Sequence, residues 1–135
     1  MIVGDNPGNH TGDNPLYPYP IGCAGYRLWQ MTDLSLAQYR ALEKVNLFGS
    51  ETEKREQNTT NARTMWLKVA MYKKVLLLGE AVRKSMCPDS QAFDMIETLS
   101  GLTVYCLPHP SGRNRVWNDA ENVHRAVALL RDFTR

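Results

Sequence analysis

The stretch "KVLLLG", residues 74–79, is the most informative about the fold, because it is an apolar run of strand length that ends in glycine. Three comparable runs occur along the chain: "MIVG" at 1–4, "KVNLF" at 44–48 and "LTVYCLP" at 102–108. None of them alternates cleanly between apolar and polar residues, which is typical of strands that are covered on both faces. We therefore predict four buried strands.

Segments with helical spacing separate these strands. Apolar residues recur on one helical face over 62–70. They recur again after Asn118, which with Glu121 has the spacing of a capping box. Shorter helices are predicted within 33–44 and 79–86. Strands that alternate with helices indicate a parallel sheet with helices on both faces. The predicted fold class is α/β, a three-layer α/β/α sandwich with a central four-stranded parallel sheet.

Two stretches are predicted to be irregular. Residues 5–25 hold too many prolines and glycines for a helix or a central strand, and the charged residues 49–58 form a surface loop or the start of a helix. Long loops rich in glycine and proline are uncommon in compact domains and often carry the function. We therefore expect the functional site to lie in such loops.

Length and composition limit the class of protein. The 135 residues are enough for one domain, 1–135, and the 43% hydrophobic and 22% charged residues are ordinary for a globular protein. A net charge of +2 permits a nucleic-acid partner without arguing for one. Three widely spaced cysteines fit a reducing compartment. Because the first residues contain neither a basic leader nor a long apolar run, we expect a cytoplasmic protein without a membrane span.

Four loops follow the predicted strands: "GDNPG", "NLFGS", "GEAV" and "PHPSGRNR". In an open parallel sheet, ligands bind at the carboxyl ends of the strands. We therefore expect these loops to converge on one cleft.

The first and last of these loops carry a family resemblance. "GDNPG" and "HPSGRNR" resemble the two signature motifs of the uracil-DNA glycosylase superfamily, whose members remove uracil and related bases from DNA. The first is close to the GxNPG of the mismatch-specific and single-strand-selective branches. The second combines the HPS of the classical branch with the PSG and trailing Arg of the mismatch-specific branch. The superfamily fold is a small four-stranded α/β/α sandwich, in agreement with the strands predicted above.

The resemblance implies three catalytic candidates. Asn6 corresponds to the residue that positions the attacking water, although an amide is a poor general base. Asp5 matches a position that is acidic in some branches, so its carboxylate is a further candidate. His109 would donate a hydrogen bond to O2 of the leaving pyrimidine and stabilise its negative charge. The prolines on both sides of His109 restrict its backbone. The alternatives are that "DNPG" is only a tight turn and that the histidine is structural.

The resemblance also implies residues that bind the flipped base. Gly4 and Gly8 belong to the first motif, and Tyr19 follows it at about the spacing of the stacking aromatic residue in relatives. Asn46 resembles the asparagine that recognises the Watson-Crick edge of uracil, since one amide can donate to O4 and accept from N3-H. Tyr19 could instead pack its loop onto the domain, and Asn46 could instead anchor a loop.

The resemblance implies that DNA is bound by the third and fourth loops. Gly79 is where relatives contact a phosphate, although Glu80 beside it would repel one unless it points away. In the last loop the small residues permit close approach to phosphates and the arginines supply charge. The residues are Ser111, Gly112, Arg113, Asn114 and Arg115. Relatives often have an apolar wedge at the position of Arg113, so the arginine is a departure from the family pattern.

The resemblance predicts a monomeric enzyme with DNA as its partner, no membrane partner, and no need for a cofactor or metal. Three cysteines cannot form the four-cysteine iron-sulfur site of some branches. Two alternatives keep the fold: a glycosylase for another modified base, and a module that binds a flipped base or lesion without cleaving it. A third is an unrelated nucleotide-binding α/β domain, which would bind mononucleotides without DNA.

Overall fold

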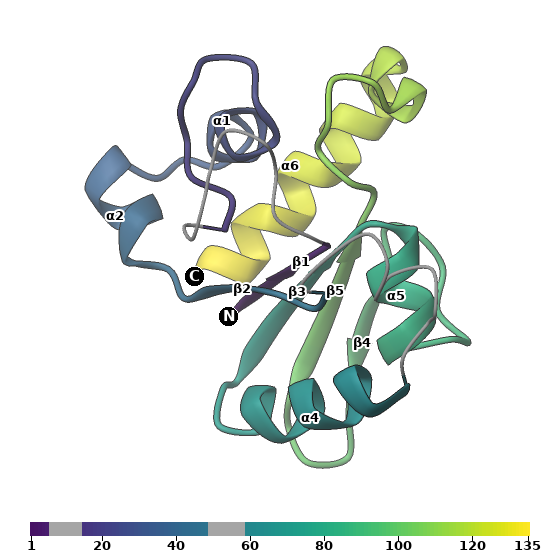
Figure 1. The fold of residues 1–135 in the computed structure, drawn as a ribbon. Helices are drawn as coiled ribbons and strands as arrows, with labels where there is room; N and C mark the ends of the chain where they lie inside the picture. The colour runs from purple at the N-terminus through teal and green to yellow at the C-terminus, as the bar shows by residue number, and fades with distance from the viewer. Residues whose placement is uncertain (6–14, 49–58) are drawn as a thin grey trace.

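A five-stranded sheet forms the centre of the computed structural model, which describes residues 1–5, 15–48 and 59–135 (Figure 1). The strand order is β2-β1-β3-β5-β4. The strands are β1 (Ile2–Gly4), β2 (Lys44–Asn46), β3 (Lys74–Leu78), β4 (Met95–Glu97) and β5 (Thr103–Leu107). The pairings β1–β2, β1–β3 and β3–β5 are parallel. The α/β class and the four predicted parallel strands are therefore confirmed.

The predicted number of strands was too low, because β4 adds an antiparallel edge to β5. β4 has only three residues, of which Met95 and Glu97 are exposed and Ile96 is half-buried. β2 is also an edge strand, but its run continues into the buried Leu47 and Phe48, whereas β4 has no such apolar run. Gly101, with a φ of +86°, lies in the turn that returns the chain to β5.

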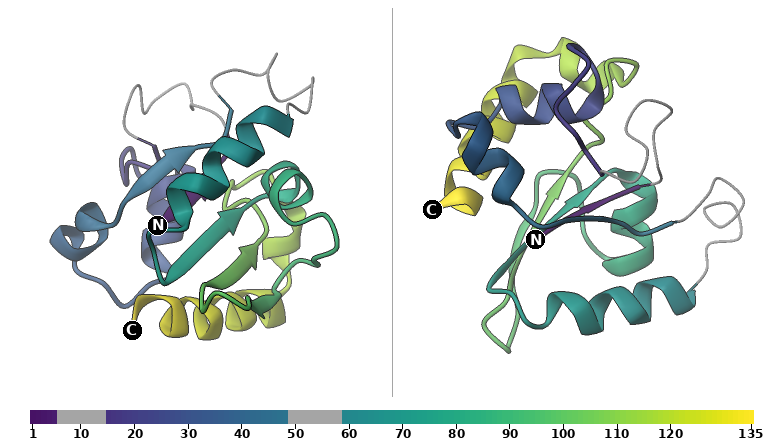
Figure 2. Two further views of the ribbon diagram at one scale, coloured as in Figure 1. Left: turned by 90° about the horizontal axis from the view of Figure 1, so that it is seen from below. Right: turned by 60° about the vertical axis from the view of Figure 1, so that its left-hand side comes forward.

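Helices cover both faces of the sheet (Figures 1 and 2). One face carries α1 (Ala24–Gln30), α2 (Leu36–Ala41) and the C-terminal α6 (Ala120–Thr134), which follows the short 3₁₀ helix η1 (Arg115–Asn118). The opposite face carries α4 (Thr59–Val69) and α5 (Glu80–Met86). The three-layer arrangement is therefore as predicted.

Two apolar cores lie on the two faces of the sheet. Leu76 and Leu78 of β3 pack into the core under α1, α2 and α6, whereas Val75 and Leu77 pack into the core under α4 and α5. All four side chains are fully buried. Successive strand residues point to opposite faces, so a strand with a core on each side must be apolar at every position. This explains the continuous apolar run at 75–78.

Two local predictions about helices need correction. The N-cap of α6 is Asp119, whose carboxylate accepts a hydrogen bond from the Glu121 amide at 2.9 Å, and not Asn118, which belongs to η1. The sequence also places residues 24 and 25 in an irregular stretch, whereas α1 begins at Ala24. The helix predicted within 33–44 is α2, which has a full capping box between Ser35 and Gln38.

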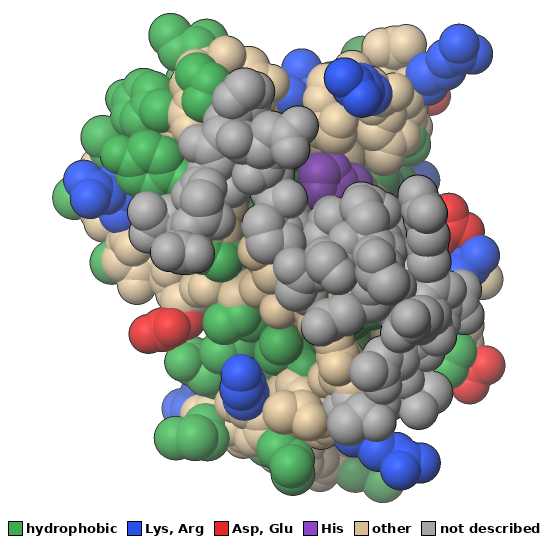
Figure 3. Space-filling view, viewed as in Figure 1, with side chains coloured by type: hydrophobic (Ala, Val, Ile, Leu, Met, Phe, Trp, Pro, Cys, Tyr) green, Lys and Arg blue, Asp and Glu red, His purple; other side chains and the backbone are tan. Residues whose placement is uncertain are grey.

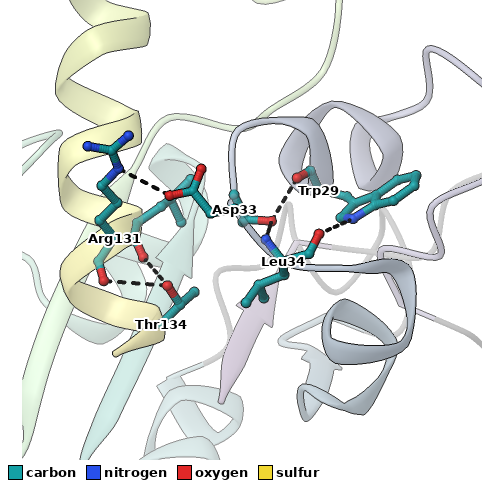
Figure 4. Close-up of polar contacts among 7 residues, drawn as sticks. Trp29, Asp33, Leu34, Arg131 and Thr134 are labelled. Carbon is teal, nitrogen blue, oxygen red and sulfur yellow. Dashed lines mark hydrogen bonds and ion pairs between the residues drawn. The ribbon is translucent and has the colours of Figure 1, made fainter.

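Polar contacts hold the connection between α1 and α2 in place (Figure 4). The indole N–H of Trp29 donates to the Leu34 carbonyl at 3.0 Å, which closes the turn after α1. Arg131 of α6 forms an exposed ion pair with Asp33 at 3.2 Å.

Candidate functional site

A cavity of about 900 Å³ lies at the carboxyl ends of β1, β3 and β5. It is lined by residues from three of the four loops predicted to converge. The predicted site residues in its lining are Asp5, Gly79, His109, Ser111, Arg113 and Asn114. Figure 3 shows a histidine side chain at the surface of one face, with lysine or arginine side chains above it. The strand order of the sheet therefore brings together residues that lie far apart in the sequence.

Hydrogen bonds fix His109 in its loop, residues 108–115, which we call the histidine loop. The carbonyl oxygen of His109 accepts from the Trp117 indole N–H at 2.8 Å and from the Asn114 side-chain amide at 3.2 Å. The Ser111 backbone amide donates to Nδ1 of the imidazole at 3.2 Å. When Nδ1 is an acceptor, a neutral imidazole carries its proton on Nε2. His109 is therefore arranged as a hydrogen-bond donor through Nε2.

Gly79 allows the histidine loop to pack closely against the end of β3. A Cβ atom at Gly79 would lie 3.5 Å from Cβ of His109, and the backbone there has a φ of +94°, which favours glycine. The Gly79 amide also donates to the Leu107 carbonyl at 2.9 Å. Gly79 therefore lies directly against His109.

Glu80, which follows Gly79, is paired within its own helix. Its carboxylate lies 2.5 Å from Nζ of Lys84, and this hydrogen bond and charge lower the pKa of Glu80. Both side chains are largely exposed. Because Lys84 offsets the charge of Glu80, the repulsion of a phosphate predicted from the sequence is reduced.

Asp5 provides a buried acidic group on the β1 side of the cavity. Only 9% of the residue is exposed, and its backbone carbonyl accepts from the Phe48 amide at 3.0 Å, which ties it to the end of β2. A carboxylate and a histidine therefore belong to one cavity lining. The neighbouring Asn6 and Gly8, predicted to position water and to bind the base, lie outside the described residues.

Asn46 lies beside Gly4 on the adjacent strand. The two residues are partners in the β1–β2 register, and a Cβ at Gly4 would come within 3.1 Å of the Asn46 side-chain oxygen. The absence of a side chain at Gly4 therefore leaves room for the Asn46 amide. Asn46 is at the expected edge of the sheet, but it is not part of the cavity lining that the described residues form.

Tyr19 is also outside that lining. It is 40% exposed, and its ring packs edge-on to Tyr17, with 6.2 Å between centroids, and obliquely to Trp29, with 6.4 Å. The base-binding roles of Tyr19 and Asn46 therefore stay predictions.

The histidine loop is a compact turn with two exposed arginines, Arg113 and Arg115. The Arg113 amide donates to the Ser111 hydroxyl at 3.2 Å and the Asn114 amide donates to the Ser111 carbonyl at 3.1 Å. Asn114 then caps η1 by accepting from the Val116 amide. Short polar residues in this loop thus hold the turn while the arginines extend into solvent.

One contact in the site had no signal in the sequence. Arg27 of α1 donates from Nε to the carbonyl of Pro110 at 3.0 Å, across 83 positions of the chain. Its guanidinium lies beside Gly112, with Nη1 3.6 Å from the position of a Cβ there. Neither the short helix α1 nor its contact with the histidine loop is encoded in a local motif.

No family model and no curated protein matches this chain. Within the three described segments, no group of three or more His, Cys, Asp or Glu side chains could hold a metal ion. The helices of those segments include none that is both long and apolar enough to cross a membrane. The three cysteines are free thiols, and burial raises the pKa of Cys106, which lies in the core.

Proposed function

We propose that this protein is a DNA glycosylase that flips uracil or a related pyrimidine out of DNA and hydrolyses its N-glycosidic bond. The observation that carries the proposal is the cavity that His109 and the buried Asp5 share, with the histidine donor fixed on a hydrogen-bonded loop. The resemblance of the two strand-end motifs to the uracil-DNA glycosylase superfamily supports the same function.

The chemistry requires stabilisation of the base as it leaves. When the bond between C1′ and the base nitrogen breaks, both electrons go to the pyrimidine, and negative charge develops on its O2. A donor already aimed at that oxygen stabilises the transition state without reorganisation. The Ser111 amide on Nδ1 leaves Nε2–H as the donor, so His109 can perform this role in its neutral form.

The other half of the reaction is the addition of water to C1′. A water molecule bonds through its oxygen and must lose a proton to a nearby acceptor. We propose that Asn6 positions this water and that the Asp5 carboxylate accepts the proton. A buried negative charge at this position also stabilises the electron-deficient sugar as the base departs.

The direct test is to incubate the protein with oligonucleotides that carry a panel of pyrimidines, and to detect released base by mass spectrometry and abasic sites by alkaline cleavage. His109→Ala should lower release by about a hundredfold or more while DNA binding stays near normal. His124→Ala on the exposed side of α6 is the matched control and should keep full activity. Equal activity of His109→Ala and the wild type would remove the histidine from the mechanism.

Two further variants separate the roles of the neighbouring residues in the first motif. Asp5→Asn should abolish most base release if its carboxylate takes the proton, whereas Asn6→Asp should keep or raise release if Asn6 only orients water. Binding of uracil-containing DNA by the wild type without any base release would reject the enzyme and support a non-catalytic binding module. Release of a different base from the panel would change the substrate and keep the mechanism.

A further inference from the structure

Arg27 is a partly exposed arginine of α1 that packs against the histidine loop. Its Nε donates to the Pro110 carbonyl at 3.0 Å, while its terminal nitrogen Nη1 lies beside Gly112 in the exposed turn of the histidine loop. An arginine has five N–H donors. The other four make no hydrogen bond within the described part of the chain. The side chain is therefore held in place by one donor, and Nη1 lies beside the turn.

The charge of Arg27 also has no acidic partner among the described residues. Elsewhere in those residues, Arg131 is paired with Asp33 at 3.2 Å and Lys84 with Glu80 at 2.5 Å. Partial burial of a guanidinium without a counter-charge is unfavourable. The exposed Arg113 and Arg115 on the histidine loop add positive charge. This environment favours an anion beside Arg27.

The backbone of the turn offers a second donor next to the same guanidinium. The amides on either side of Gly112 are engaged, since Ser111 donates to His109 and Arg113 donates to the Ser111 hydroxyl. The Gly112 amide makes no such bond in the described structure, and the residue is exposed. Without a side chain at Gly112, an anion can reach this amide closely.

We infer that Arg27 and the Gly112 amide together bind one phosphate of the DNA backbone, next to the nucleotide whose base enters the cavity. This inference rests on the proposed function for the identity of the anion. Arg27 also bonds to the carbonyl of Pro110, directly after His109, so the phosphate contact and the position of the histidine are mechanically linked. Arg27 is in this sense both a phosphate-binding residue and a positioning residue for the histidine loop.

The salt dependence of DNA binding tests this inference separately from catalysis. The probe is a fluorescein-labelled duplex with one tetrahydrofuran abasic analogue, which cannot be cleaved by a glycosylase, titrated at several KCl concentrations. The slope of log K against log [KCl] is negative, and loss of one phosphate contact reduces its magnitude by about 0.9. Arg27→Gln should therefore weaken binding about 15-fold at about 0.05 M KCl and about fivefold at about 0.15 M, with the difference vanishing near 1 M.

Two other variants make the outcome decisive. Arg131→Gln removes the same charge from a surface arginine that pairs with Asp33 (Figure 4), and it should leave the slope unchanged. Arg27→Lys keeps the charge, so it should keep the slope but slow base release, because lysine cannot hold Pro110 and a phosphate with one planar group. A wild-type slope in a folded Arg27→Gln protein, or an equal loss of slope in Arg131→Gln, would overturn the inference.

The base-release assay distinguishes failure of this inference from failure of the proposed function. Base release by the wild type together with an unchanged slope for Arg27→Gln rejects the phosphate contact and keeps the glycosylase. An Arg27-dependent slope without any base release rejects the glycosylase and keeps the phosphate contact.

Discussion

Replacing Gly25 with alanine sets two effects of opposite sign against each other. Gly25 lies in the first turn of α1, and alanine is favoured over glycine in helices by about 1 kcal/mol. A Cβ at Gly25 would, however, lie 2.2 Å from the carbonyl oxygen of Tyr17 and 2.3 Å from that of Leu16. Both are backbone atoms, so no side-chain rotation can relieve the overlap. We expect the steric effect to be the larger one.

The magnitude follows from the kind of contact. Overpacking a tight site costs about 1–3 kcal/mol, and a rigid backbone neighbour places Gly25→Ala at the upper end of that range. After subtraction of the gain in helix propensity, we expect a net loss of about 2 kcal/mol in the free energy of unfolding. For a chain of 135 residues, this lowers the melting temperature by about 7 °C.

Urea and thermal unfolding measure this change directly. Gly22→Ala is the matched control, because its φ of +89° is strained for alanine but no atom lies within 4 Å of the new Cβ. It should lose only about 1 kcal/mol. Because α1 carries Arg27, base release should fall in Gly25→Ala as well. A Gly25→Ala protein as stable as the wild type would show that α1 does not depend on this contact.

Three further variants test other parts of the structure. Gly79→Ala should lose about 1–2 kcal/mol of stability and slow base release, because its φ is +94° and its Cβ would contact His109; unchanged kinetics would contradict this. Burial raises the pKa of Tyr39, so unfolding frees a group that ionises near pH 10. Wild-type stability should therefore fall above pH 10, and this group contributes up to about 1.4 kcal/mol per pH unit. Tyr39→Phe, which also loses the hydrogen bond from the Tyr39 hydroxyl to the Leu16 carbonyl, should show a shallower fall. Trp117→Phe removes the indole donor to His109 and should lower kcat for base release more than it changes KM, whereas a pure KM effect would place Trp117 in substrate binding.

The strands were predictable because the sheet imposes a strong pattern. A strand between two cores must be apolar at every position, so 74–79 and 102–108 stood out and agree closely with β3 and β5. β4 could not be found in this way, since it contacts one neighbour and exposes two of its three side chains. An apolar run therefore detects strands with buried side chains and misses a short strand whose side chains face solvent.

The convergence of the strand-end loops was predictable from topology alone, whereas α1 was not. Parallel strands bring their carboxyl ends to one edge, which places Asp5 and His109 in one lining. α1 has seven residues, begins with a glycine in its first turn and contains aromatic residues that are weak helix formers. Its formation depends on packing against residues 16–17, and its contact with the histidine loop depends on the tertiary fold.

The arrangement of charge in the cavity bears on the choice between an enzyme and a binding module. A module that only binds a base needs no proton acceptor for water, which is the role proposed for the buried Asp5. Hydrolysis does need one, since in the proposed reaction this carboxylate accepts a proton from water and stabilises the positive sugar. In the same proposal, the Nε2–H donor of His109 stabilises the negative base. Opposite requirements at the two ends of one breaking bond therefore favour the glycosylase.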